Sequence, residues 1–244
     1  MNDKIDMFDY FATLSDMDIS HTEKVGRYGV MKNKEKNIFN DIKYKINLDT
    51  KNNILDIGCG CGAVVYQLID YAQNKNKKLV LNDSTQVLNQ IKNSIKIKSN
   101  IKFIEGKFQK INLKKERKFD AIILYSVLHY IDKENILDVI DSILHILDEG
   151  GLCLIGDIPN MDKRDRFNNS SFGKIFNSEW SKDKAICHIT ENYPSIDLSF
   201  FDDKLVSRIL NYVRAKGGFN AYLLPQSSKM PFGYIRDDIL IEKL

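Results

Sequence analysis

The chain has 244 residues and a formal net charge of +3. Its residues are 43% hydrophobic and 28% charged, and this length and composition fit one large α/β domain with a sizeable core. The basic residues are spread along the whole chain, which argues against a nucleic-acid partner, because such proteins usually concentrate their charge in one patch. No apolar run approaches the roughly 18 residues that span a bilayer, and the polar start at residues 1–6 is unlike a signal peptide, so we expect no membrane partner and a cytoplasmic location.

Predicted secondary structure begins with a polar stretch over residues 1–50, whose scattered aromatic side chains indicate short helices ahead of the main fold. Behind it the apolar pattern switches repeatedly between strand and helix periodicity. The expected strands are 54–57, 79–81, 101–104, 119–125 and 151–155, and the expected helices are 63–73, 86–97 and 133–147. This alternation, with near-continuous apolar strands, predicts a parallel sheet covered by helices on both faces.

The C-terminal third is less regular. Periodicity fails from about 159 to 200, and a helix over 202–216 and strands over 219–224 and 237–241 follow. The two strands are joined by a long loop that contains Pro225, Pro231 and Gly233. We therefore expect an irregular insertion at about 159–200, placed between the fifth strand and the last helix.

A glycine-rich turn, Asp56-Ile57-Gly58-Cys59-Gly60-Cys61-Gly62, connects the first strand to the first long helix. Glycines let a backbone approach a ligand closely, and the carboxyl end of a parallel strand is where such folds bind ligands. The glycines, followed by Asp83 about 20 positions on, suit NAD and S-adenosylmethionine (SAM) alike. Asp56 favours SAM, because its carboxylate complements the methionine ammonium group and would repel a pyrophosphate. No P-loop lysine and hydroxyl residue accompany the turn, which argues against a nucleoside triphosphate.

Metal binding is not expected. Cys59 and Cys61 form a lone C-x-C within the turn, with no second pair, and we interpret them as small residues that fit the loop. Cys153 and Cys187 show no disulfide spacing.

The turn resembles motif I, D-x-G-x-G-x-G, of the class I SAM-dependent methyltransferases, small-molecule type. Three further segments are similar to that family in order and spacing. They are Leu81–Ser84 at the end of the second strand, Phe119–Ile123 with Ser126–Tyr130 after the fourth, and Leu147–Leu152 before the fifth. The last two expected strands resemble the closing hairpin of the family.

The resemblance implies an α/β fold: a doubly wound, mostly parallel seven-stranded sheet with an antiparallel C-terminal hairpin. It divides the chain into an N-terminal helical lid at 1–50 and a methyltransferase domain at 51–244, whose insertion at about 159–200 lies on the acceptor side. The implied cofactor is SAM. The residues expected to bind it are Asp56, Gly58, Cys59, Gly60, Gly62, Asp83, Ser84, Lys107, Phe108, Tyr125 and Ser126.

One position departs from the family pattern. The family often has an aspartate after the third strand that accepts a hydrogen bond from the adenine amino group, and this chain has Lys107 there. A lysine cannot accept that bond. Phe108 could stack on adenine instead, or its backbone could bind the base.

Five residues are candidates for the acceptor side. His129 either serves as a general base or positions the acceptor, or it only anchors the start of the next helix. Asp157 follows the fifth strand and is either an acceptor contact or a turn residue. Tyr28 either lines the acceptor pocket or packs the lid onto the core. Arg164 and Arg166 suit an anionic acceptor, or belong to a solvated charge run.

These features predict a methyltransferase that acts on a small-molecule acceptor, anionic or carbohydrate, at an oxygen of a sugar, nucleotide sugar or phosphorylated metabolite. Two alternatives stay open. An RNA-modifying methyltransferase is disfavoured because the segment after the fourth strand is not Asn/Asp-Pro-Pro-Tyr and a Pro-Cys nucleophile is absent. A non-catalytic SAM-binding module is disfavoured because Asp56 and Asp83 are both present. Abundant Lys, Asn and Ile are typical of AT-rich bacterial genomes, and the oligomeric state stays open.

Overall fold

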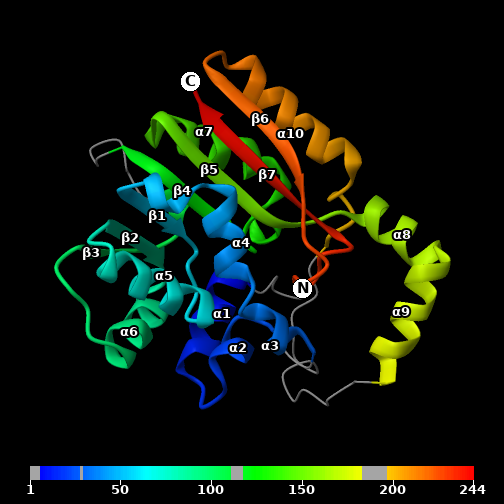
Figure 1. The fold of residues 1–244 in the computed structure, drawn as a ribbon, viewed down its shortest axis with the longest axis horizontal. Helices are drawn as coiled ribbons and strands as arrows, with labels where there is room; N and C mark the ends of the chain where they lie inside the picture. The colour runs from blue at the N-terminus through cyan, green and yellow to red at the C-terminus, as the bar shows by residue number, and fades with distance from the viewer. Residues whose placement is uncertain (1–5, 28–29, 111–117, 183–196) are drawn as a thin grey trace.

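The sheet has the predicted architecture. A computed structural model describes residues 6–27, 30–110, 118–182 and 197–244, and its sheet has the strand order β3-β2-β1-β4-β5-β7-β6 (Figure 1). The strands are β1 Asn53–Ile57, β2 Lys78–Asp83, β3 Ile101–Glu105, β4 Phe119–Tyr125, β5 Leu147–Pro159, β6 Phe219–Pro225 and β7 Arg236–Lys243. Neighbours among β1 to β5 pair in parallel, whereas β7 pairs antiparallel with both β5 and β6. The doubly wound sheet and its C-terminal hairpin are therefore confirmed.

Helices cover both faces of this sheet, and each face has its own apolar core. The flanking helices are α4 Ile38–Lys45, α5 Ala63–Asn74, α6 Thr85–Ser94, α7 Ile136–Ile146 and α10 Asp203–Ala215. Side chains alternate across a strand, so Ala121 and Ile123 of β4 pack on the side of α4, α5 and α6. Ile122 and Leu124 pack on the side of α7 and α10. This double coverage explains why β4 is a continuous apolar run in the sequence.

The N-terminal segment divides between lid and core. Its first helices are α1 Met7–Asp16, α2 His21–Lys24 and α3 Val30–Glu35. Helix α1, part of the predicted lid, packs against α6 near the carboxyl edge of the sheet. Helix α4 differs, because its Ile38 and Ile42 are fully buried in the core beside α5. The predicted boundary at residue 50 thus runs through packed structure.

Up to residue 182, where the structure describes the predicted irregular insertion, it is largely helical, which corrects the expectation from the sequence. Residues 161–169 form α8 and residues 171–182 form α9, and together they extend away from the sheet (Figure 1). The Asn160 side chain starts α8 by accepting a hydrogen bond from the backbone N–H of Lys163 at 3.0 Å. No residue of α8 is buried, so the sequence carries no apolar period there. In the part of the chain that the structure describes, no helix is long and apolar enough to cross a membrane.

Candidate functional site

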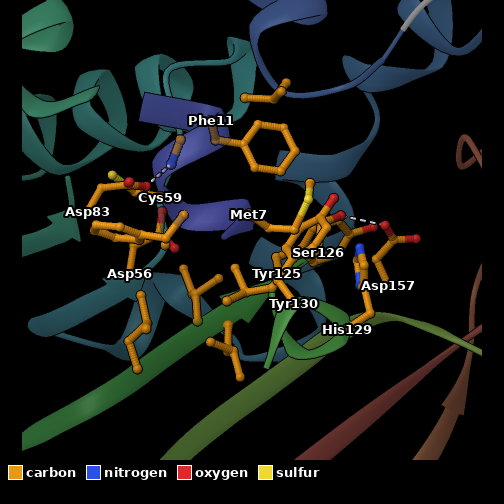
Figure 2. A pocket seen from close by; sticks show the side chains of 18 of the residues that line it. Met7, Phe11, Asp56, Cys59, Asp83, Tyr125, Ser126, His129, Tyr130 and Asp157 are labelled. Atoms are coloured by element: carbon orange, nitrogen blue, oxygen red, sulfur yellow. Dashed lines mark hydrogen bonds between the residues drawn. The ribbon is translucent and has the colours of Figure 1, made fainter. Parts of the chain in front are cut away.

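A cavity of about 690 Å³ lies at the carboxyl edge of the parallel strands. At one end it is lined by the glycine turn after β1 and by Asp83 at the end of β2. At the other end it is lined by His129 after β4 and Asp157 within β5, and Figure 2 shows these residues around one continuous space. Met7 and Phe11 of α1 also line it, so the predicted lid forms part of the cavity wall.

The glycine turn is shaped by backbone angles that favour glycine. Gly58 and Gly60 have φ values of +65° and +61°, in the left-handed region. The N–H of Gly58 donates to the carbonyl of Asn82 at 2.9 Å, and the N–H of Gly60 donates to Oδ2 of Asp83 at 2.9 Å. A Cβ on Gly60 would lie 2.9 Å from a methyl group of Val25. The turn is thus fixed to β2, and its backbone lies at the cavity wall together with the side chain of Cys59.

Two buried carboxyl groups flank this turn. Asp56 and Asp83 are only 5% and 8% exposed. Burial, reinforced by the charge of Asp83, raises the pKa of Asp56 to about 8. Burial raises the pKa of Asp83 to about 6, although the N–H groups of Gly60 and Ser84 oppose the rise. Among the described residues neither carboxyl group has a cationic partner, so this end of the cavity suits a ligand that supplies a cation and hydroxyl donors.

The segment after β3 connects the cavity to the lid. Lys107 lines the cavity and forms an ion pair with Asp6, which caps α1, and its Nζ lies 5.6 Å from the ring centroid of Phe8. Phe108 is buried and lines the same end of the cavity. Ser84 is placed differently from its prediction, since its hydroxyl caps α6 by accepting from the N–H of Val87 and its side chain is not part of the cavity wall.

We call the end of the cavity at the ends of β4 and β5 the acceptor end. Two residues there that contact each other, one from each strand end, have a strained backbone. Ser126 and Asp157 both have φ of 59°, which is uncommon outside glycine and costs of order 1–3 kcal/mol each. The hydroxyl of Ser126 donates to Oδ2 of Asp157, as the dashed line in Figure 2 marks. Nη2 of Arg27 donates to the same hydroxyl at 3.2 Å. A chain of polar contacts therefore runs from the lid across the ends of β4 and β5.

His129 lies in a 3-10 turn at Leu128–Tyr130 and is 7% exposed. Its Nδ1 is buried and has no hydrogen-bond partner among the described residues. Burial, followed by the charges of Arg236 and Arg27, holds the pKa of His129 well below its usual value, so the imidazole is neutral at pH 7. The next helix, α7, begins at Ile136, so His129 lines the cavity and does not form the start of that helix.

The two arginines predicted to bind the acceptor lie away from this cavity. Both belong to α8, and neither is part of the cavity wall. Arg166 donates to both carboxylate oxygens of Asp203, at 2.6 and 3.1 Å. The Arg164 side chain is 46% exposed, with its Nε 3.7 Å from Asp165. The structure therefore does not bring them together with His129 and Asp157. Tyr28 lies outside the described residues.

Three residues that the sequence did not single out also line the cavity. Arg27 lies 3.4 Å from Glu35, whose Oε1 also accepts from the N–H of Ala63 at 3.1 Å at the start of α5. Burial raises the pKa of Glu35 although Arg27 opposes the rise. Arg236, the first residue of β7, places its guanidinium 4.9 Å from the ring centroid of Phe232. No local motif marks these positions, because each reaches the site only through the fold.

Comparison with known proteins agrees with this geometry. Residues 54–151 match the family model described as a methyltransferase domain, which confirms the resemblance to class I methyltransferases. No curated protein matches the chain.

Solved structures share the fold at low sequence identity. The N-methyltransferase NodS from Bradyrhizobium japonicum, in complex with S-adenosylhomocysteine (SAH), is 14% identical over 98% of each chain, with a TM-score of 0.58. The plantazolicin methyltransferase BpumL, in complex with a pentazolic desmethylPZN analogue and SAH, is 15% identical over 98% of this chain and 99% of that one, with a TM-score of 0.60. Human N-acetylserotonin methyltransferase, in complex with SAM, is 18% identical over 84% of this chain and 51% of that one, with a TM-score of 0.53.

Proposed function

With a methyltransferase domain identified over residues 54–151, we propose that this protein transfers the methyl group of SAM to a small-molecule acceptor. The observation that carries the proposal is the single cavity that joins the glycine turn to the ends of β4 and β5. Its volume of about 690 Å³ and its cover by α1 suit a cofactor and a small acceptor bound side by side.

The residues at the glycine turn fit this cofactor. The glycines of the turn adopt backbone angles that other residues rarely adopt, and Asp56 offers a buried carboxylate to the methionine ammonium group. The carboxylate oxygens of Asp83 each accept one backbone N–H, from Gly60 and from Ser84. Each oxygen has a further lone pair, which can accept a hydrogen bond from a ribose hydroxyl. When bound, the cofactor supplies an electrophilic methyl group. The chain supplies orientation, exclusion of water and a place for the proton.

The acceptor end suits a hydroxyl acceptor. His129 is neutral and its Nδ1 is unpaired, so in this proposal it takes the proton of an acceptor hydroxyl at the carboxyl edge of β4. Ser126 and Asp157 form a rigid polar wall beside it and hydrogen-bond the rest of the acceptor. A sugar, a nucleotide sugar or a phosphorylated metabolite provides both a hydroxyl and further polar groups, and we propose the acceptor from this class.

Titration calorimetry with SAH tests the proposed function directly. We expect one molecule of SAH to bind per chain. Above pH 8, where Asp56 is ionised, we expect no binding of NAD⁺, because the carboxylate would face its pyrophosphate. If NAD⁺ binds and SAH does not, the glycine turn serves a dinucleotide and the proposal is wrong.

SAH should bind more tightly as the pH rises from 6 to 8. In the free protein the pKa of Asp56 is about 8, and a bound ammonium group favours its ionised form. Below pH 8 binding must therefore release a proton, which weakens the apparent affinity by up to about tenfold per pH unit. Calorimetry in two buffers of different ionisation enthalpy counts that proton. Asp56→Asn should abolish the release, and an affinity that is flat across this range would contradict the assignment.

Chelation should leave SAH binding unchanged. The described residues contain no group of three or more His, Cys, Asp or Glu side chains that could hold a metal ion. A methyl displacement from a sulfonium also requires no Lewis acid. We expect the same affinity before and after dialysis against EDTA, and a loss that a divalent cation restores would contradict this.

A further inference from the structure

The guanidinium of Arg236 lies at the acceptor end of the cavity. Arg236 pairs with Pro159 at the point where β7 begins, and β7 runs antiparallel to β5. The first residue of β7 is therefore at the carboxyl edge of the parallel strands. In the sheet order, β4 and β5 separate β7 from β1 and its glycine turn, so Arg236 lies away from the cofactor end. It lines the cavity together with His129 and Asp157.

This guanidinium has unfilled donors. Its Nε and Nη1 are buried and find no hydrogen-bond acceptor among the described residues. The carboxylate of Asp157 lies 3.9 Å from Nε, beyond hydrogen-bond distance, and its other oxygen already accepts from Ser126. One face of the guanidinium lies over Phe232. A buried cation with unmet donors is costly for a folded protein, and such a group is normally paired.

The surroundings favour a negatively charged partner. Arg27 is a second cation of the same cavity, and both arginines act on the charge state of His129. Two acids face these arginines. Asp157 accepts from Ser126 and lies 3.9 Å from Nε of Arg236, and Glu35 forms an ion pair with Arg27 and accepts from the N–H of Ala63. An incoming oxyanion could fill the Arg236 donors without displacing either contact.

We propose that Arg236 binds a carboxylate or phosphate group of the methyl acceptor and thereby holds the acceptor beside His129. The inference rests on the proposed function and narrows its acceptor to anionic molecules. It also relocates the anion site expected from the sequence. The arginines on α8 are not part of this cavity's wall, whereas Arg236 has two N–H groups inside the cavity that lack a hydrogen-bond acceptor among the described residues.

Three probes of one shape test the charge preference: benzoate, phenyl phosphate and benzyl alcohol, each titrated into SAH-saturated protein and followed by ligand-observed NMR. A ring suits this end of the cavity, which Phe232 and Tyr130 line. We expect at least one of the two anions to bind about tenfold or more tightly than the neutral alcohol, as for a charge-assisted contact. The preferred anion then distinguishes a carboxylate acceptor from a phosphorylated one.

Matched variants assign the preference to this residue. Arg236→Gln should lose the preference, Arg236→Lys should keep part of it, and Arg164→Gln on α8 should bind all three probes like the wild type. SAH affinity should stay within about threefold in every variant, since Arg236 lies away from the cofactor end of the cavity and the substitution changes a single distant side chain.

Equal binding of the three probes by the wild type would overturn the inference without any variant. So would an Arg236→Gln protein that keeps the anion preference, or one that loses SAH affinity, which would place Arg236 at the cofactor end. A wild-type protein that fails to bind SAH overturns the proposed function itself. The two failures are therefore distinguishable, because SAH binding is measured before any probe is added.

Discussion

Replacing Asp83 with alanine should weaken SAH binding by about 2–4 kcal/mol, or roughly 30- to 800-fold in Kd. The carboxylate is buried and is held in place by the N–H groups of Gly60 and Ser84. It is therefore preorganised to accept hydrogen bonds from two ribose hydroxyls, and its removal leaves both without a partner. Calorimetry is best performed above pH 8, where both Asp83, with a pKa of about 6, and Asp56, with a pKa of about 8, are ionised.

Two variants make this result interpretable. Glu105→Ala changes an exposed carboxylate at the end of the neighbouring strand, and it should leave the affinity unchanged. Asp83→Asn keeps the size of the side chain but loses its charge and one acceptor, so its affinity should fall between those of the wild type and the alanine variant. A change of less than about threefold in Asp83→Ala would show that the ribose binds elsewhere.

His129→Asn should lower kcat by at least about 100-fold while SAH binds as in the wild type. The substitution keeps a polar side chain of similar size and removes the group that accepts the proton. Burial and the two arginines lower the pKa of His129, so the imidazole loses its basic form only below its ordinary range near pH 6.5. The wild-type rate should therefore hold at pH 7 and fall as the pH drops through that lowered pKa. Rates of methyl transfer at saturating SAM measure both effects.

His145→Asn is the matched control, because His145 is exposed on α7 and faces no cavity. Its kcat and pH profile should equal those of the wild type. If His129→Asn also stays within about tenfold of wild type with an unchanged profile, orientation of the two substrates alone accounts for the rate. In that case Asp157 becomes the next candidate for the proton.

The sheet could be predicted because its signals are local. Residues 119–125 read as a strand from composition alone, since burial on both faces leaves β4 continuously apolar. The arm formed by α8 and α9 could not be predicted in the same way. A helix that buries nothing has no apolar stripe, and α8 is recognisable only by the cap that Asn160 provides.

The same contrast between local and long-range signals separates the two ends of the site. Asp56, the glycine turn and Asp83 belong to two adjacent parallel strands, so a strand–turn–helix pattern was enough to place them together. The acceptor end is built from distant segments. Arg27 comes from the lid, and Arg236 reaches Asp157 only because β7 pairs with β5. The pattern of a single sequence does not show which strand β7 pairs with. The sequence therefore predicts the anion site at the conspicuous basic stretch on α8.

The position of β7 has a consequence for folding during synthesis. The strand lies between β5 and β6, yet it is the last of the seven to leave the ribosome. At about 5–20 residues per second, the growing chain exposes the edge of β5 for roughly 4–15 s after that strand emerges. An open, apolar strand edge is a template for pairing with another chain. The nascent polypeptide is therefore most prone to aggregation in this interval.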